Sequence, residues 1–433
     1  MTILSHDLRG VGWSSLSRPA QGDPTDFSEH SRCFGSLDLD SSTMQPKEIT
    51  ELAERWSIAG RGGAGFPLAR KISAVSSASR LGRSPIVVAN GAESEPLSYK
   101  DRVLLWTHPH LVLDGLELIC AAIGARESYL CIHEDDNLYG YLQAAVDRRP
   151  DHSRVPPLRL VEIDGGFVSG QETSLVSFLD SGVGQPRFQP PRPSVKGVRN
   201  RPTLISNVET LARLAQAYHQ DRSGSRSGIL SYLGTFWTRK GGVVYEVESS
   251  HSLNDVLALS GEPPEVELTL LVGGYFGSFQ RISNTLRSTP LERIPSTSLR
   301  LGAGVLVAFP SDACMVREAM RVVRYLGSQS AGQCGPCKFG LPSIASELES
   351  IVRGGEGSIV RIWERTRQLP GRGACSMPDG FSQLVQSVLH TCEEELDDHV
   401  HRGCTRVDYG IIPEVPRVGN NDDDAVGQRV RRH

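Results

Sequence analysis

The alternation of short apolar runs with amphipathic segments over residues 84–166 most constrains how this chain folds. The runs SPIVVANG, ESYLCIHED and LRLVEIDGG are strand-like, and segments with apolar residues at helical spacing, such as PHLVLDGLELICAAIGA, lie between them. Strands that alternate with helices are typical of a mostly parallel sheet covered on both faces. We therefore predict an α/β fold for this part of the chain.

The pattern changes near residue 240. VVYEVESS, VELTLLVGGYFGSF and GAGVLVAFP are strand-like, and SLNDVLALSG between the first two is helix-like, which predicts a small α+β module. After Pro310, four segments carry apolar residues at spacings of three and four, which predicts an antiparallel helical bundle. The expected division is an N-terminal arm of coil or surface wrap at 1–47, the α/β domain at 48–238, the α+β module at 239–310, the bundle at 311–405 and a disordered tail at 406–433.

Charge and hydropathy exclude several classes of function. The chain has 433 residues and a formal net charge of -4, whereas a domain that grips phosphate backbones usually carries a positive excess; no nucleic-acid partner is expected. The apolar run at 111–125 is interrupted by Asp114 and Glu117 and is shorter than the roughly 20 residues of a spanning helix. The first residues reach Asp7 and Arg9 before any apolar core of signal-peptide length, so we expect a cytoplasmic location.

A glycine-rich loop, GRGGAGFP at 60–67, contains the pattern G-x-G-x-x-G. The dinucleotide fingerprint requires a strand before the loop, but a helical segment precedes it here, so an ordinary Rossmann loop is not expected. The small residues still let backbone N–H groups approach an anion, and Arg61 and Lys71 add positive charge. The loop is a candidate anion site, with a plain turn between helices as the alternative.

Polar residues follow the predicted strands and gather at helix starts. NGAESEPLSYKDR follows the strand at 85–89, DGGFVSGQETSLVSFL follows the strand at 158–163, and RPTLISNVETLARLA leads into a third helix. Ligands of open α/β sheets bind beyond the carboxyl ends of the strands. We therefore expect these loops to converge on one ligand site, with solvated surface charge as the alternative. The polar residues concerned are Asn90, Glu93, Glu95, Asp101, Gln171, Glu172, Ser206 and Asn207.

The cysteines indicate metal, cluster or redox chemistry. Their number, nine, is odd, which argues against a disulfide framework. Cys334 and Cys337 form a C-x-x-C pair in SQSAGQCGPCKFG, a spacing suited to thiolate ligation. The other cysteines are expected to be ordinary: Cys120, Cys131 and Cys314 in the core and Cys404 at a helix end, with no partner identified for Cys33.

Four blocks, in this order, resemble the NADH-oxidising flavoprotein subunit of respiratory complex I and its relatives in NAD-reducing hydrogenases and formate dehydrogenases. They are GRGGAGFPLARK, ANGAESEPLSYKDR, the stretch from GGFVSGQETS to LISNVET, and the C-x-x-C pair with the later GRGACSMPDGF. The match spans about residues 48 to 405. It implies a Rossmann-like domain that binds FMN and NADH in one cleft, a ubiquitin-like domain, and a four-helix bundle that carries a 4Fe–4S cluster.

The resemblance also implies a function and a set of residues. A nicotinamide delivers two electrons as hydride and a cluster accepts one at a time, so a flavin between them connects the two. A ferredoxin-like or other iron–sulfur partner would take the electrons from the cluster. This chain would not span the membrane and would lie, at most, at the periphery of a membrane complex. By similarity FMN contacts Gly62, Gly63, Asn90, Glu93, Gly170, Glu172 and Asn207, the dinucleotide side includes Phe66, Lys71 and Glu95, and Gly60, Arg61 and Ser206 complete the cofactor-binding set.

Three departures from the family pattern fall in the expected cofactor site; the first removes a carboxylate that would hydrogen-bond the flavin, and the other two bear on the choice of dinucleotide. Ala92 stands in place of an aspartate, Gln171 in place of a glutamate, and Arg192 in place of an aromatic residue. Loss of a negative charge and gain of a guanidinium both favour an extra phosphate on the adenine ribose. NADPH, or no nicotinamide at all, is therefore an alternative to NADH as the donor.

A fourth departure concerns the cluster. Ala331 stands where the family has a third cysteine of C-x-x-C-x-x-C, so three ligands remain, Cys334, Cys337 and Cys375. The open alternatives are Cys392, His390 or an external small ligand as fourth donor, a 3Fe–4S form, zinc, or no metal. The rival functions are a non-catalytic or zinc-stabilised scaffold subunit and a flavoprotein reduced only by a protein donor.

Overall fold

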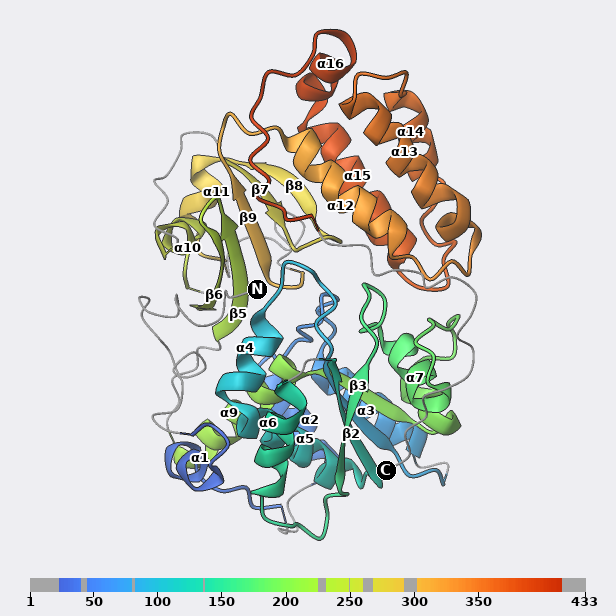
Figure 1. Cartoon of the computed structure of the whole chain (residues 1–433). Coiled ribbons are helices and arrows are strands. Elements are labelled where there is room, and N and C mark those ends of the chain that lie inside the picture. Colours follow the sequence, from blue (N-terminus) through green and yellow to red (C-terminus); the bar gives the residue numbers. More distant parts are fainter. Residues whose placement is uncertain are drawn as a thin grey trace.

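The computed structural model describes residues 23–39, 45–79, 82–134, 137–224, 231–248, 250–259, 268–291 and 302–414. Residues 1–22 of the expected arm and 415–433 of the expected tail lie outside this part of the chain. In Figure 1 an α/β domain forms the lower half, and a second sheet and a helical bundle lie side by side above it.

The α/β domain is built on a four-stranded sheet of order β3-β2-β1-β4, in which all neighbours are parallel. Alternate residues of β1 face opposite sides: Val87 and Ala89 join the core formed with α5 and α9, whereas Ile86 and Val88 join a smaller core with α7. Helices thus cover both faces, which confirms the predicted α/β class. The strands are β1 (Ile86–Gly91), β2 (Glu127–His133), β3 (Leu158–Ile163) and β4 (Thr203–Asn207). The helices are α2 (Pro46–Arg55), α3 (Leu68–Ser79), α4 (Lys100–Thr107), α5 (Pro109–Ile123), α6 (Leu138–Asp147), α7 (Glu172–Ser181), α8 (Pro193–Lys196) and α9 (Val208–Ser223).

Part of the expected N-terminal coil is helical. Helix α1 (Phe27–Phe34) begins at the cap residue Asp26 and places His30 in the interior. Its Nε2 atom lies 2.8 Å from the Asp114 carboxylate of α5, which His219 of α9 also contacts at 2.8 Å. The coil prediction is therefore wrong for these residues, because a buried ion network fixes the helix to the domain.

The second sheet has five strands in the order β6-β5-β9-β7-β8. Its first strand, β5, pairs antiparallel with β6 and parallel with β9. The boundary expected at residue 238 therefore falls inside the hairpin that joins β5 to β6, and the sheet begins at Ser231. The strands are β5 (Ser231–Thr238), β6 (Gly241–Glu248), β7 (Leu268–Val272), β8 (Ser278–Ile282) and β9 (Val305–Phe309), with helices α10 (Leu253–Leu259) and α11 (Asn284–Ser288).

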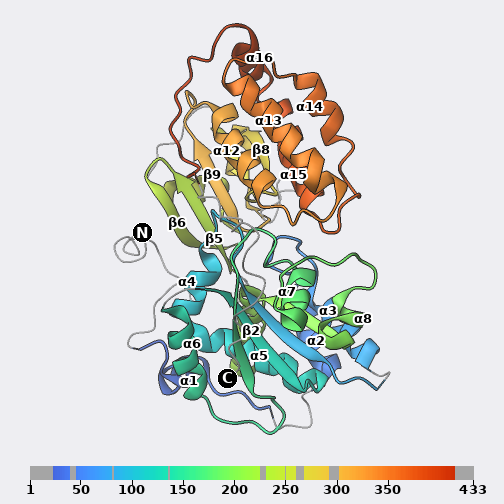
Figure 2. The same ribbon diagram turned by 45° about the vertical axis from the view of Figure 1, so that its right-hand side comes forward.

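The C-terminal region is the expected helical bundle, and Figure 2 shows it beside the second sheet on the same side of the α/β domain. Its last predicted segment divides at Cys392 into two helices. Residues after 406 are ordered where a tail was expected: the N–H groups of Ile411 and Ile412 donate to the Glu318 carboxylate at 3.0 and 2.9 Å. The helices are α12 (Met315–Ser328), a π-helical turn (Pro336–Gly340), α13 (Leu341–Val352), α14 (Ile359–Thr366), α15 (Met377–Thr391) and α16 (Glu393–His401). Within the described ranges, no helix has the length and apolar character needed to cross a membrane.

Candidate functional site

The carboxyl edge of the parallel sheet brings the three predicted loops together. Asn90 at the end of β1 and Asn207 at the end of β4 are register partners. The Asn90 amide donates to the carbonyl of Gly170 at 2.8 Å, which fixes the loop before α7 against β1. The Asn207 amide donates to Asp101 at 2.6 Å, while its oxygen accepts from the N–H of Glu209 and caps α9. Two helix N-termini and one loop therefore face the same space.

The glycine-rich loop lies beside these helix starts. It closes on itself through a hydrogen bond from the N–H of Gly60 to the carbonyl of Phe66, 2.9 Å long. Gly63 has φ +98° and Gly65 has φ +63°, conformations that L side chains rarely adopt, and a Cβ at either would have no neighbour within 4 Å. A Cβ at Gly62 would lie 3.8 Å from the side chain of Asn207. The loop therefore presents bare backbone to the carboxyl edge of the sheet.

Lys71 and Gln171 position the start of α7. Lys71 Nζ, on α3, donates to the carbonyl of Ile205 at 2.9 Å and pairs with the Glu172 carboxylate. The side-chain oxygen of Gln171 accepts from the N–H groups of Thr173 and Ser174 at 2.9 and 3.0 Å. Gln171 is thus the N-cap of α7, and its neutral side chain fills this role. The sequence alone did not reveal it.

Glu93 and Glu95 border a cavity of about 190 Å³. Glu93 accepts from the N–H groups of Asp101 and Arg102 at the start of α4, at 3.1 and 3.2 Å. Burial, with a smaller contribution from the charge of Asp101, raises the pKa of Glu93 to about 7. Glu95 accepts from the N–H of Tyr275 at 2.8 Å, and burial raises the pKa of Glu95 to about 8. Both carboxyl groups therefore hold protons far more readily than exposed glutamates do.

Arg61 does not offer its charge to the cavity, contrary to the sequence prediction. Its Nε donates to Glu209 at 3.1 Å, its Nη2 donates to the carbonyl of Leu233 at 3.2 Å, and its guanidinium lies 4.8 Å from the centre of the Tyr232 ring. Glu209 is fully buried, and the charges of Arg61, Lys100 and Arg213 outweigh the effect of burial and hold its pKa well below the usual range. Arg61 therefore joins the glycine loop to the second sheet.

Sequence reasoning did not identify the buried ion cluster around Glu209. Lys100 lies 2.5 Å from Asp101 and 3.2 Å from Glu209, and Asp101 in turn accepts from Asn207. The cluster supports the side chains at the edge of the sheet from below. Its sequence signal is weak, because charged residues at helix starts are usually solvated.

The rim of the site carries Phe66 and Arg192. The guanidinium of Arg192, at the start of α8, lies 5.8 Å from the centre of the Phe66 ring. Arg192 is exposed and Phe66 is partly buried. The pair forms a flat cationic and aromatic surface next to the glycine loop. Ser206 is buried within β4 at 2% exposure, so its side chain belongs to the sheet interior.

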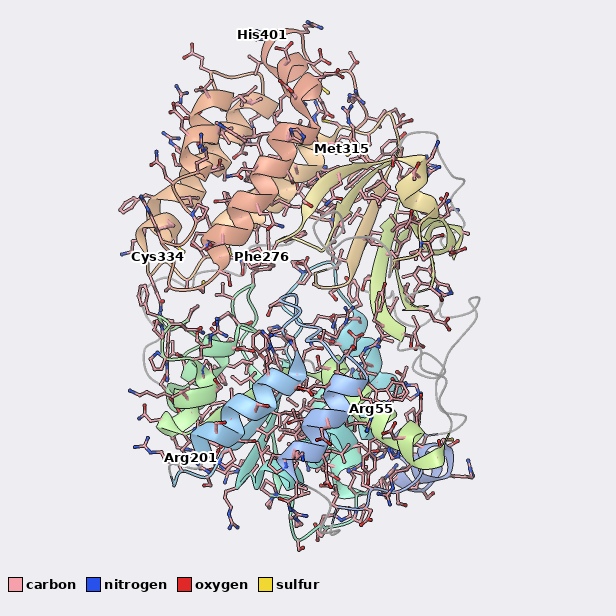
Figure 3. The ribbon with its side chains drawn as sticks, turned by 180° about the vertical axis from the view of Figure 1, so that it is seen from behind. Arg55, Arg201, Phe276, Met315, Cys334 and His401 are labelled. Atoms are coloured by element: carbon pink, nitrogen blue, oxygen red, sulfur yellow. The ribbon has the colours of Figure 1, made fainter. Side chains whose placement is uncertain are left out.

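The three predicted cluster cysteines lie at the end of the bundle that faces the α/β domain, where Figure 3 labels Cys334. The Cys334 and Cys337 sulfurs are 3.2 Å apart. Burial raises the pKa of Cys334, but hydrogen bonds from Cys337 outweigh it, so the net shift is downward. Burial raises the pKa of Cys375, which directly precedes the N-cap of α15, and the charge of Cys334 adds to this shift. Gln333 reaches the α/β domain through a 3.0 Å hydrogen bond to Gln185.

The structure excludes two of the proposed fourth ligands. Cys375 precedes α15, whereas His390 and Cys392 lie at the opposite end of that helix. Fifteen residues of helix span about 22 Å at about 1.5 Å per residue, so neither side chain reaches the thiols. Next to Ala331, the Ser330 hydroxyl lies 3.4 Å from the carbonyl oxygen of Cys337. The fourth position is therefore occupied by small residues.

Two family models match the chain. The first, described as the Nuo51 FMN-binding domain, matches residues 53–216, and the second, described as the NADH-ubiquinone oxidoreductase-F iron–sulfur binding region, matches residues 317–399. The chain belongs to the family of NADH-binding flavoprotein subunits of complex I and its relatives. This membership confirms the predicted family and its cofactor set, FMN and an iron–sulfur cluster.

Relatives of this flavoprotein are similar along most of their length. An NADH-quinone oxidoreductase subunit of Rhizobium meliloti is 27% identical over 378 residues, which cover 82% of this chain and 89% of the relative. The corresponding NADH-quinone oxidoreductase subunit of Aquifex aeolicus is 26% identical over 380 residues, with 82% and 87% covered. A solved NAD+-reducing NiFe hydrogenase in the H2-reduced state matches with a TM-score of 0.74 at 25% identity and 83% coverage of this chain. This chain spans only 63% of that hydrogenase chain.

One feature at the sheet edge suits the phosphate of a flavin mononucleotide. The open loop at Gly63 and Gly65 presents bare backbone N–H groups, which suit a phosphate. N–H groups in the first turns of α7 and α9 are instead capped by the Gln171 and Asn207 side chains. A cavity of about 190 Å³ lies beside Glu93 and Glu95, next to the end of β1. The first family model spans all three loops.

Proposed function

We propose that this chain is an electron-transfer subunit that takes hydride from NADH onto FMN and passes single electrons through an iron–sulfur cluster to a partner redox protein. The observation that carries the proposal is the convergence of the glycine loop, the Asn90 loop and the start of α7 at one sheet edge. The Cys334 and Cys337 thiols lie at the end of the bundle that faces this domain (Figure 3). When bound, FMN accepts two electrons from a nicotinamide and releases them singly.

In this proposal the open part of the glycine loop, from Gly62 to Gly65, would bind the FMN phosphate through its N–H groups. Asn90 and Gly170 hold the two walls together by their 2.8 Å hydrogen bond, and Lys71 fixes Glu172 beside them. Glu93 and Glu95 border the cavity as carboxyl groups that retain protons near neutral pH. They therefore repel an anionic ligand less than two fully ionised glutamates would.

The donor nucleotide is assigned to the side of Phe66 and Glu95. Family membership supports NADH. Arg192 supports NADPH as a second candidate, because its exposed guanidinium lies over Phe66 and binds phosphate through paired hydrogen bonds. Gln171 does not decide between them, since its oxygen caps α7.

The proposed cluster would be held by Cys334, Cys337 and Cys375, and Ala331 supplies no fourth thiolate. Because His390 and Cys392 are excluded as ligands, two arrangements remain. One is a 4Fe–4S cluster bound by three thiolates and an external small ligand, and the other is a 3Fe–4S cluster. The zinc-stabilised scaffold remains the alternative of another class, and a flavoprotein reduced only by a protein donor is the alternative within the same class.

We propose a partner that carries its own iron–sulfur cluster, because one cluster without a terminal acceptor must pass its electrons on. Phe339, which follows Cys337 by two residues, is 74% exposed and supports a contact face next to the thiols. The subunit is proposed to lie peripherally on its complex. A cytoplasmic location is supported by nine cysteines that are all free, as in a reducing compartment.

The donor assignment is tested by stopped-flow reduction of the FMN-loaded protein with NADH and with NADPH. We expect NADH to bleach the flavin faster than NADPH does. In an Arg192→Tyr variant, the ratio of the NADH rate to the NADPH rate should increase. The matched control is Lys196→Tyr, which changes an exposed cation on the same short helix. Faster reduction by NADPH that is lost in Arg192→Tyr makes NADPH the donor, and no reduction by either leaves a protein donor.

A further inference from the structure

A second group of potential metal ligands lies inside the C-terminal bundle, apart from the three cluster thiols. It consists of Cys314, Glu395, His399 and Cys404, whose ligand atoms all lie within 4.8 Å of one another. Three of the side chains are buried and Cys404 is partly exposed. We propose that these four residues bind a structural Zn²⁺ ion, independently of the redox function.

The distances between the ligand atoms suit a tetrahedral ion. Zinc binds sulfur at about 2.3 Å and nitrogen or oxygen at about 2.0–2.1 Å, so a regular tetrahedron separates two sulfurs by about 3.8 Å and a sulfur from a nitrogen by about 3.5 Å. The Cys314 and Cys404 sulfurs are 3.8 Å apart, and the Cys314 sulfur lies 3.3 Å from His399 Nε2 and 3.0 Å from Glu395 Oε1. Small rotations about the side-chain bonds would therefore complete the coordination shell.

The chemistry of the donors also favours zinc. Two thiolates, one imidazole and one carboxylate form a mixed set of the borderline-soft type that Zn²⁺ accepts, and all four positions come from the protein. No position is left for a substrate or a reactive water among these four donors. The site therefore has the closed form of structural zinc rather than the open form of a catalytic ion.

Backbone contacts hold the ligands in place without the ion. Glu395 and His399 are one helical turn apart on α16 and so lie on the same face. The N–H of Cys314 donates to the carbonyl of Val407 at 2.7 Å, which brings the segment after α16 beside the start of α12. The N–H of Val316 donates to Glu395 Oε1 at 2.8 Å and orients that carboxylate. Such supporting hydrogen bonds are usual around metal ligands.

The proposed site is separate from the cluster thiols. Cys314 precedes α12, whereas Cys334 follows its far end. The 14 residues of that helix span about 21 Å at about 1.5 Å per residue. Figure 3 places Cys334 at the bundle end near the α/β domain and His401, two residues after His399, at the opposite end. A zinc ion here would join α12, α16 and the segment that leads to Ile412.

The test counts metals in the full-length protein prepared without oxygen and supplied with iron and zinc. We expect one zinc per chain in the wild type and in a Cys334→Ser/Cys337→Ser variant, because those thiols belong to the other site. We expect the zinc to be lost in Cys404→Ser and in His399→Gln. Cys33→Ser, which changes the exposed cysteine of α1, is the matched control and keeps its zinc.

A spectroscopic measurement on the wild type keeps the test independent of variant folding. X-ray absorption at the zinc edge should show two sulfurs at about 2.3 Å and two lighter ligands at about 2.0–2.1 Å. Three sulfurs, or zinc that disappears with Cys334 and Cys337 but survives in Cys404→Ser, would overturn the proposal. So would a wild type that binds no zinc, or a Cys314–Cys404 disulfide found by mass spectrometry in the protein as isolated.

Discussion

The substitution Gly170→Ala tests whether the proposed FMN site depends on the close approach of two loops. An added Cβ would lie 2.5 Å from the Ser94 hydroxyl and 2.6 Å from the carbonyl oxygen of Ala92. Real Cβ atoms essentially never approach so closely, and the Ala92 oxygen is backbone that cannot rotate away. Gly170 must therefore move, and with it the carbonyl that accepts from Asn90.

The magnitude follows from two effects. Forcing one extra carbon into a closely packed position costs about 1–3 kcal/mol. Displacement also weakens the 2.9 Å hydrogen bond from the Gly170 N–H to Ser94, and such bonds contribute about 0.5–1.5 kcal/mol. Each kcal/mol lowers the melting temperature of a domain of this size by about 2–4 °C. We thus expect a lower melting temperature and a loss of FMN affinity.

The assay combines thermal unfolding of the protein without FMN with a flavin-fluorescence titration. The matched control is Gly165→Ala in the same loop, where a Cβ would have no neighbour within 4 Å and the backbone is not left-handed. The reasoning predicts a loss of stability and affinity in Gly170→Ala alone. If Gly170→Ala binds FMN as tightly as Gly165→Ala does, the two walls do not form the flavin site.

Three further predictions concern acid stability, a buried carboxyl group and the cluster. Burial lowers the pKa of His108 and of His110 to about 4 each. Both side chains take up protons on unfolding, so their contribution to stability is present above about pH 6.5 and is lost as the pH falls towards 4. Urea unfolding at several pH values measures this loss. Burial raises the pKa of Glu95 to about 8. In the protein without ligand, Glu95→Gln should therefore increase the free energy of unfolding by an amount that grows from about pH 4.5 and levels off above about pH 8. An increase that does not depend on pH would contradict this prediction. Ala331→Cys supplies a fourth thiolate, so a 3Fe–4S form should gain one iron per chain after reconstitution, and a four-iron form should exchange its external ligand for sulfur, which iron-edge X-ray absorption measures. If neither the iron content nor the iron ligands change, Ala331 lies away from the cluster.

The sequence predicts those parts of the molecule in which neighbouring residues carry the signal. Each strand of the first sheet is a short apolar run because both of its faces are buried, so β1 and β2 are visible as patterns. Asn90 and Asn207 were predicted to lie together because the carboxyl ends of parallel strands share one edge. The order of three domains followed from the same local patterns and from four ordered motifs.

The features that escaped prediction depend on contacts between distant segments. The sequence places Arg61 beside a candidate anion site, but the residue that binds its guanidinium, Glu209, lies 148 residues away. The coil expected around His30 is a helix because Asp114 binds it. The sequence predicts Cys314 to be an ordinary core residue. Its contacts with Glu395, His399 and Cys404 form only when α16 folds against the start of α12, so the sequence does not reveal them.

The most direct test of the proposed function is the visible absorption spectrum of the protein prepared without oxygen and mixed with equimolar FMN and with enough iron and sulfide for a complete cluster. One sample is then titrated with NADH and a second with NADPH. We predict flavin bands on a broad iron–sulfur background, with one FMN bound per chain and bleaching of both features by NADH. A folded protein that binds no FMN, or one whose bound flavin neither NADH nor NADPH reduces, would contradict the proposed transfer of hydride from a nicotinamide.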